Sequence, residues 1–169
     1  MYHAIFIPPM YKYTSLLSLL LLVAIGCTRK LHTPIADTQA INQLMDKWHH
    51  AAAVADEDTF FGSMAADAIY LGTDASERWT LNEMREWSKP YFAKESAWVL
   101  KPFSRNVYFS KDGQYAWFEE KIATDHMGEC RGSGVLRRIA SGWQIMHYNL
   151  AIAVPNALVK DLLLLQKKK

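Results

Sequence analysis

The residues best suited to acid–base chemistry lie near the carboxyl end of the chain. His147 and Asn149 are two positions apart in a segment that is expected to form a strand, so their side chains should share one face. An imidazole changes its protonation state near neutral pH, and a neighbouring carboxamide can orient a polar ligand. We therefore take His147 as the candidate catalytic acid or base. The alternative, which we favour, is a core histidine whose ring is satisfied by hydrogen bonds.

Two adjacent glutamates, Glu119 and Glu120, supply the second kind of titratable group. Successive side chains of a strand point to opposite faces, so at most one of the two can face a cavity, and the pattern does not decide which. We include Glu120 among the candidate pocket residues. A buried carboxylate is expected to pair with Arg131 or Arg105, and such a pair is more often structural than catalytic.

The sequence lacks the spacing typical of two other kinds of site, a nucleophilic serine and a metal centre. Ser133 stands between two glycines, but the strand–turn–helix setting of a nucleophilic serine is missing around it. His49 and His50 are adjacent on an expected helix, so their rings diverge, and no group of His, Cys, Asp or Glu has metal-ligand spacing. We predict neither a metal ion nor a cofactor.

A curved sheet is needed to position these residues, because the last long strand, residues 142–152, is apolar on both faces. Strand alternation places one set on the face that we expect to line a cavity: Trp143, Ile145, His147, Asn149 and Ala151. The other set comprises Gln144, Met146, Tyr148, Leu150 and Ile152. We expect helices to cover the first face and a second copy of the chain to cover the second, so the protein is predicted to be a homodimer.

The expected helices precede most of the strands. Asp37 should cap a helix whose apolar residues recur every three or four positions, namely Ile41, Leu44, Met45, Trp48 and Ala52. Asp56 can start a second, short helix. Thr80 and Glu83 have the spacing of a capping box, which predicts a third helix. Strands are expected at residues 68–71, 107–110, 114–124, 130–138 and 142–152.

Four segments carry a resemblance to a known family: GTDASERWT (72–80), AWFEE (116–120), CRGSGVLRR (130–138) and GWQIMHYNLAIAVPN (142–156). With the order of elements, they resemble the nuclear transport factor 2-like superfamily and, within it, a bacterial lipoprotein subgroup of SnoaL-like proteins whose function is undefined. The resemblance implies a cone-shaped α+β fold with N-terminal helices packed on a curved antiparallel sheet. The family includes isomerases, dehydratases, polyketide cyclases and nonenzymatic binders, so the fold does not select a function.

Aromatic residues favour a binding pocket inside this expected cone. We predict a site for a small, largely apolar molecule, with acid–base isomerase or dehydratase chemistry by His147 or a pocket carboxylate as one alternative. A homodimeric protein-interaction domain is the other. The candidate pocket residues are Trp48, Tyr70, Trp87, Trp117, Glu120, Arg131, Trp143, Ile145, His147 and Asn149.

The amino-terminal segment predicts export and a lipid anchor. Residues 16–25 form an apolar run of signal-peptide length, and Ala24-Ile25-Gly26-Cys27 resembles a bacterial lipobox, which makes Cys27 the lipidation site. We expect a signal peptide over residues 1–26, with Met10 as an alternative start, and a tether over 27–36. The SnoaL-like domain should span 37–156, and a helix with a basic tail 157–169. The domain is then held at the bacterial cell envelope, outside the cytoplasm.

Charge and cysteine content narrow the partners further. The formal net charge is only +2 at pH 7, so we expect no nucleic acid partner. The chain has 2 cysteines, and with Cys27 modified, Cys130 has no partner for a disulfide. The expected partners are a small molecule, the membrane through Cys27, and a second copy of the chain.

Overall fold

The computed structural model describes residues 33–167 of the chain. The expected signal peptide, the alternative start at Met10 and the lipidation site at Cys27 lie outside these residues. Within residues 33–167, no helix combines the length and the apolar character needed to cross a membrane.

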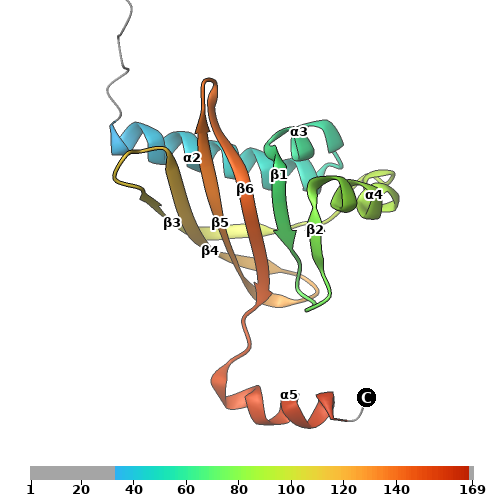
Figure 1. Ribbon diagram of the computed structural model, residues 1–169. Helices are drawn as coiled ribbons and strands as arrows, with labels where there is room; N and C mark the ends of the chain where they lie inside the picture. Colours follow the sequence, from blue (N-terminus) through green and yellow to red (C-terminus); the bar gives the residue numbers. More distant parts are fainter. Residues whose placement is uncertain (1–32, 168–169) are drawn as a thin grey trace, which may run out of the picture. The chain divides into compact units, whose positions relative to one another are not determined.

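Three helices precede the main strands and cover one face of the sheet (Figure 1). They are α2 (Pro34–Ala53), α3 (Glu57–Gly62) and α4 (Leu81–Phe92). The predicted caps of the last two are confirmed: Asp56 accepts a hydrogen bond from the Thr59 amide at 3.0 Å, and Thr80 and Glu83 form a reciprocal capping box. The apolar spacing of α2 also predicts its packing correctly, since Ile41, Met45, Trp48 and Ala52 are buried.

The expected cap at Asp37 is wrong. The helix α2 begins earlier, at Pro34, because proline at the first helical position has the required φ and no amide to satisfy. Asp37 therefore lies in the first turn, where its carboxylate pairs with the Arg138 guanidinium at 2.8 Å. This ion pair joins the start of α2 to the sheet.

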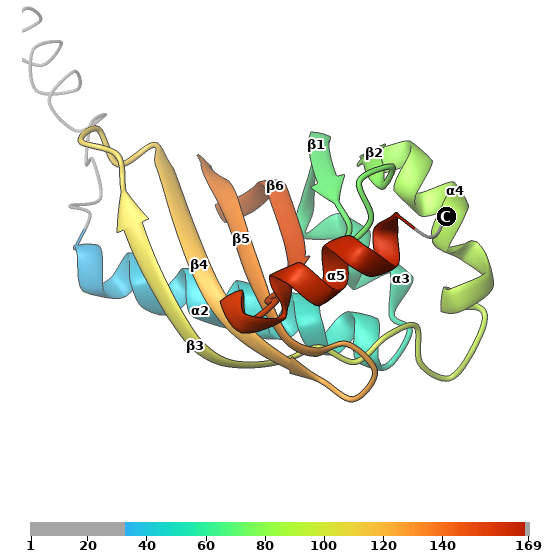
Figure 2. The same cartoon turned by 90° about the horizontal axis from the view of Figure 1, so that it is seen from below.

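Six strands form one curved sheet that does not close into a barrel. They are β1 (Met64–Leu71), β2 (Arg78–Thr80), β3 (Lys101–Phe109), β4 (Tyr115–Thr124), β5 (Gly128–Ile139) and β6 (Gly142–Ile152), in the order β2-β1-β6-β5-β4-β3. Neighbouring strands are antiparallel except β1 and β6, which are parallel. The sheet bends around α2, which runs across its concave face, with α3 and α4 at the end where β1 and β2 lie (Figures 1 and 2). The α+β fold with helices on a curved sheet is confirmed.

A β-bulge in β6 reverses the predicted faces of its second half. Val135 pairs with His147, but the next residue, Leu136, pairs with Ile145, so Met146 is an extra residue. Trp143 and Ile145 face the helices before the bulge, and Tyr148 and Leu150 face them after it. The prediction that positions 143 to 151 alternate without interruption is therefore wrong, and His147 and Asn149 point to the outer face.

The core fills the concave side of the sheet. Trp48 of α2 stacks on Phe60 with ring centroids 4.7 Å apart and contacts the Tyr148 ring edge-on at the same distance. Tyr148 is fully buried and Leu150 is 6% exposed. Our expectation that these two side chains belong to a surface for a second subunit is therefore wrong, because the helices of the same chain cover them.

The segment after β6 leads to the short helices η2 (Asn156–Leu158) and α5 (Val159–Gln166). In Figure 1 α5 lies beyond the end of β6, away from the sheet. None of the α5 side chains is buried. This helix therefore takes no part in the core.

Candidate ligand pocket and buried charged cluster

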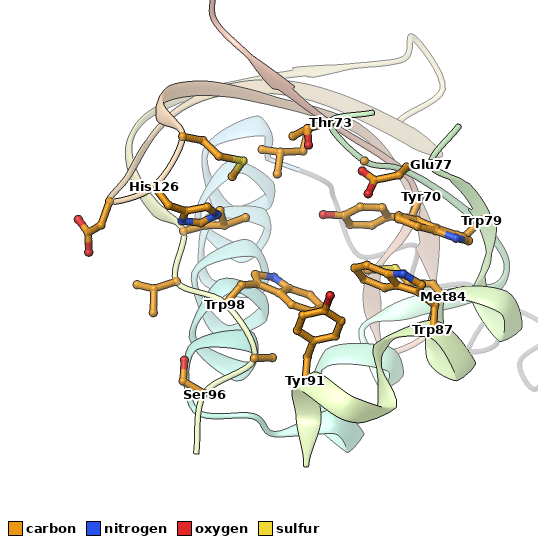
Figure 3. A pocket seen from close by; sticks show the side chains of 17 residues that line it. Tyr70, Thr73, Glu77, Trp79, Met84, Trp87, Tyr91, Ser96, Trp98 and His126 are labelled. Atoms are coloured by element: carbon orange, nitrogen blue, oxygen red, sulfur yellow. The ribbon is translucent and has the colours of Figure 1, made fainter. Parts of the chain in front are cut away.

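A cavity of about 470 Å³ opens between α4, the loop after β1 and the turn between β4 and β5 (Figure 3). Five aromatic side chains lie on its walls: Tyr70, Trp79, Trp87, Tyr91 and Trp98. Its polar side chains are Thr73, Glu77, Ser96, Asp125 and His126. Cavities of this size and mixed lining are typical of small-molecule sites.

The aromatic side chains form a continuous series of ring contacts. Trp79 of β2 stacks on Trp87 of α4 with centroids 4.6 Å apart, and Trp87 contacts Tyr91 at 5.0 Å. Trp87 and Tyr91 are four residues apart on α4, which places them on the same helix face. Trp87 remains 41% exposed, so the helix presents a large aromatic surface to the solvent-filled opening.

Tyr70 supplies a polar group at the inner end of the cavity. The residue is only 6% exposed, and its hydroxyl points into the cavity in Figure 3. Within the described part of the chain, this hydroxyl makes no hydrogen bond. Burial, together with the charges of Glu77 and Glu120, raises the pKa of Tyr70 far above its ordinary value. The phenol therefore stays protonated and can donate to a ligand.

Glu77 is held at the cavity by the loop after β1. Its Oε2 accepts from the Asp74 amide at 3.1 Å, and its backbone oxygen accepts from the Gly72 amide at 2.9 Å. A methyl group on Gly72 would collide with Oε2 of Glu77, so glycine allows the carboxylate to pack against the backbone. Asp74 stabilises the same loop, because its Oδ1 accepts from the Ser76 amide at 2.9 Å.

A buried charged cluster lies deeper in the cone, around Glu120. Its Oε1 accepts from His49 Nε2 at 2.7 Å and from the Tyr148 hydroxyl at 3.0 Å, and its Oε2 accepts from Arg105 Nε at 2.8 Å. Gly132 faces the cluster, and a Cβ there would lie 2.7 Å from Glu120 Oε1. The predicted partner Arg105 is therefore confirmed, whereas Arg131 does not contact Glu120.

The electrostatics of the cluster favour an ionised Glu120. Burial alone would raise the pKa of Glu120, but the hydrogen bond and charge of His49, together with Arg105, lower it below its ordinary value. Burial and the neighbouring Glu120 raise the pKa of Tyr148, which keeps that phenol protonated as a donor. Every oxygen of the carboxylate is thus paired, as the low exposure of the site requires.

This cluster does not open onto the cavity. Tyr70 lies on the cavity wall and packs against Tyr148 with centroids 5.4 Å apart, and Tyr148 in turn bonds Glu120. One layer of aromatic rings therefore separates Glu120 from a ligand. Across residues 33–167, no three His, Cys or acidic side chains are grouped so as to hold a metal ion.

The structure brings only two of the ten candidate pocket residues, Tyr70 and Trp87, to the cavity. Four others belong to the buried interior: Trp48, Glu120, Trp143 and Ile145. The remaining four point to the outer face of the sheet: Trp117, Arg131, His147 and Asn149. Burial and the nearby charge of Arg78 lower the pKa of His147, which does not touch the cavity. The prediction that His147 lines the pocket is therefore wrong, because the bulge in β6 turns its side chain to the outer face.

Most of the cavity lining was not among the ten candidates, for example Glu77, Trp79 and Tyr91, whereas Trp98 was expected only as one of several tryptophans that could line or fill a cavity. Glu77 and Trp79 belong to the GTDASERWT segment. The sequence therefore identified their motif but did not predict that their side chains face the cavity. Tyr91 stands four residues after Trp87, and this spacing could have joined the two on one helix face. Trp98 lies in an irregular segment, where periodicity gives no signal.

The outer face of the sheet carries a second group of aromatic residues. Tyr108 and Trp117 stack with centroids 5.9 Å apart and are 44% and 46% exposed. Glu119 accepts hydrogen bonds from the Tyr108 hydroxyl and the Asn106 amide, both at 3.1 Å. The choice left open by the sequence is thus resolved, with Glu120 inside and Glu119 outside.

The sequence profile of the SnoaL-like domain matches residues 41–155, which is more than half of the chain. A search of curated protein sequences gives no match. The profile match covers every strand and all helices of the cone except the start of α2.

Solved structures share the fold at low sequence identity. An NTF2-like protein of unknown function from Pseudomonas putida has a TM-score of 0.60 and 14% identity, covering 73% of this chain and 91% of its own. A proposed aromatic ring hydroxylase from Novosphingobium aromaticivorans has a TM-score of 0.59 and 22% identity, with 73% and 94% covered. A proposed dehydratase of the NTF2-like family from Streptomyces avermitilis has a TM-score of 0.57 and 14% identity, with 73% and 100% covered.

Proposed function

Given that the chain belongs to the SnoaL-like domain family, we propose that it binds a small, largely apolar molecule in the cavity beside α4. The observation that carries this proposal is the open aromatic lining with the hydroxyl of the nearly buried Tyr70 aimed into it. An aromatic pair of good geometry contributes about 0.5–1.5 kcal/mol beyond the area it buries. A flat ligand that contacts two or three of these rings would therefore gain about this much binding free energy from each ring.

The position of the hydroxyl supports an oriented ligand. The Tyr70 hydroxyl faces the cavity and bonds no other group of residues 33–167, so it is available to donate to a ligand carbonyl or hydroxyl oxygen. The aromatic walls would then select size and shape, and Tyr70 would select a ligand with an oxygen at one end. Small-molecule sites commonly combine apolar walls with a few convergent polar groups in this way.

The geometry favours binding over the alternative of acid–base catalysis. Related folds include a proposed dehydratase and a proposed ketosteroid isomerase, the latter from Parabacteroides distasonis. In this chain, however, His147 lies on the outer face, and an aromatic layer covers Glu120. Neither group could reach a molecule in the cavity without a rearrangement of the core. The carboxylates that do line the cavity are engaged, because Glu77 accepts from the Asp74 amide and Asp125 pairs with Lys101, so we place ligand binding first.

The binding proposal can be tested by isothermal titration calorimetry with 2-naphthol as the probe. Thr73→Trp would fill the opening of the cavity, whereas Ala75→Trp adds the same side chain two residues away, outside the lining. Both positions are exposed, so neither change disturbs the core. We expect at least a tenfold loss of affinity for Thr73→Trp and little change for Ala75→Trp. Equal affinities in all three proteins would contradict the proposal.

We also propose that the outer face forms the homodimer surface. Exposed Tyr108, Tyr115 and Trp117 form an apolar patch of the kind that marks interfaces. Trp117→Lys should convert a dimer into a monomer in light scattering. Ile35→Lys on α2, which removes an even more exposed apolar side chain away from the patch, should not. A wild-type protein that is monomeric at all concentrations would refute the idea.

The lipid anchor remains a proposal that rests on the lipobox-like residues. We propose that Cys27 is acylated and that the domain is held at the bacterial cell envelope, outside the cytoplasm. Each buried methylene of an acyl chain adds about 0.8 kcal/mol of membrane affinity, so two or more chains hold a domain firmly. Cys27→Ser should abolish incorporation of radiolabelled fatty acid, and unchanged labelling would refute the anchor.

A further inference from the structure

We propose that the ligand of the cavity beside α4 is an organic cation, such as an ammonium ion with an aromatic or alkyl body. This inference rests on the proposed binding function and adds a charge to the ligand. Its starting point is the composition of the cavity lining, to which residues 33–167 contribute the carboxylates of Glu77 and Asp125 but no lysine or arginine. An anionic ligand would find no cation to pair with there.

Glu77 carries the uncompensated charge. Asp125 is neutralised by Lys101, whose ammonium lies 3.0 Å from each carboxylate oxygen. Glu77 has no such partner, since in the described part of the chain no Lys or Arg forms an ion pair with it. The backbone of its loop holds the carboxylate in place through the Asp74 amide. A fixed negative charge therefore lies beside an apolar cavity.

The field of this carboxylate reaches the ligand space. Glu77 contributes to the raised pKa of Tyr70, whose hydroxyl projects into the cavity. A negative potential that disfavours a phenolate at this point favours a cation at the same point. Aromatic rings on several sides of the cavity replace part of the water that would otherwise screen this charge.

The aromatic walls act in the same direction. The rings come from four segments of the chain, namely β1, β2, α4 and the stretch after α4, so they enclose the cavity from several sides (Figure 3). The faces of tryptophan and tyrosine rings are electron-rich and attract a cation within about 6 Å. The measured strength of such contacts corresponds to roughly a two- to thirtyfold gain in affinity for each well-placed ring.

The experiment compares two ligands of the same shape that differ only in charge. The cation is 4-(hydroxymethyl)phenyltrimethylammonium, and its neutral counterpart is 4-tert-butylbenzyl alcohol. Both carry a hydroxyl for Tyr70 and an aromatic ring for the walls. Calorimetry measures the affinity of both compounds under the same conditions.

We expect the cation to bind about ten times more tightly than the neutral compound. Glu77→Gln should lower the affinity for the cation several-fold and leave the neutral compound unchanged, which also shows that the cavity remains intact. Glu86→Gln removes one acidic charge from α4 outside the lining and should change neither affinity.

The outcomes separate this inference from the function on which it rests. Equal binding of the two compounds would overturn the cation proposal and leave the proposed binding function standing. Binding of neither compound would overturn both. The comparison in the wild-type protein needs no variant, so the test holds even if Glu77→Gln fails to fold.

Discussion

Glu120→Gln is the substitution that tests our account of the core most sharply. The glutamine oxygen can still accept from His49 and Tyr148, but its amide would face Arg105 Nε, where the wild-type carboxylate lies 2.8 Å away. Arg105 is 7% exposed and would keep only the exposed Asp46 as a charged partner. Removing one partner of a buried ion pair costs about 3–5 kcal/mol of stability. For Glu120→Gln we expect a loss near the lower value, because the hydrogen bonds from His49 and Tyr148 survive.

The matched control is Glu119→Gln, which makes the same change one residue earlier on the same strand. Glu119 bonds Asn106 and Tyr108 on the outer face, where solvent replaces lost contacts. We expect a change below about 0.5 kcal/mol there. Urea denaturation followed by circular dichroism measures both values, and the double variant Glu120→Gln/Arg105→Gln should lose less than the two single losses added together.

A loss of stability in Glu120→Gln no larger than that in Glu119→Gln would contradict a stabilising buried ion pair. The pH dependence gives an independent check. The folded-state pKa of Glu120 lies below its ordinary value of 4.5, so its contribution to stability is complete above that value and disappears as the pH falls through the lowered pKa. Glutamine does not titrate, so the difference in unfolding free energy between wild type and Glu120→Gln should narrow from pH 5 to pH 3. A difference that widens in acid would contradict the assignment.

Two further substitutions test the packing and the helix boundary. Gly132→Ala would place a methyl group against Tyr148 and Glu120 and should destabilise the fold by about 1–3 kcal/mol. Urea denaturation measures this loss, and an unchanged midpoint would mean that the cluster is loosely packed. Thr80→Ala removes the cap of α4 and should lower the free energy of unfolding in thermal denaturation by about 1 kcal/mol, whereas Thr80→Ser should keep most of the cap's contribution. A loss of equal size in both variants would mean that the hydroxyl is not the cause.

Local signals in the sequence predicted two of the three helix starts correctly, whereas α2, β1 and β3 begin earlier than expected. Helix caps at Asp56 and Thr80 depend on neighbours within three residues, so their chemistry is visible without the fold. The partner of Glu120 could be narrowed to two arginines because a buried carboxylate requires a cation. The resemblance of the motifs to SnoaL-like proteins then supplied the arrangement of helices and sheet.

The site could not be predicted in the same way, for two physical reasons. A single extra residue at Met146 exchanges the two faces of β6, and no residue type marks that bulge. The cavity is lined largely from loops and from α4, so residues such as Glu77 and Trp98 meet only through the tertiary fold. Strand alternation in β6 pointed instead to His147, which lies on the other side of the sheet.

Native mass spectrometry of the full chain purified from its source tests the binding claim most directly. We predict a retained small molecule of a few hundred daltons in the wild-type protein and in Ala75→Trp, and its loss in Thr73→Trp, whose side chain would occupy the opening. A wild-type protein that carries no ligand, or a ligand that stays bound in Thr73→Trp, would contradict the assignment of this cavity as the binding site.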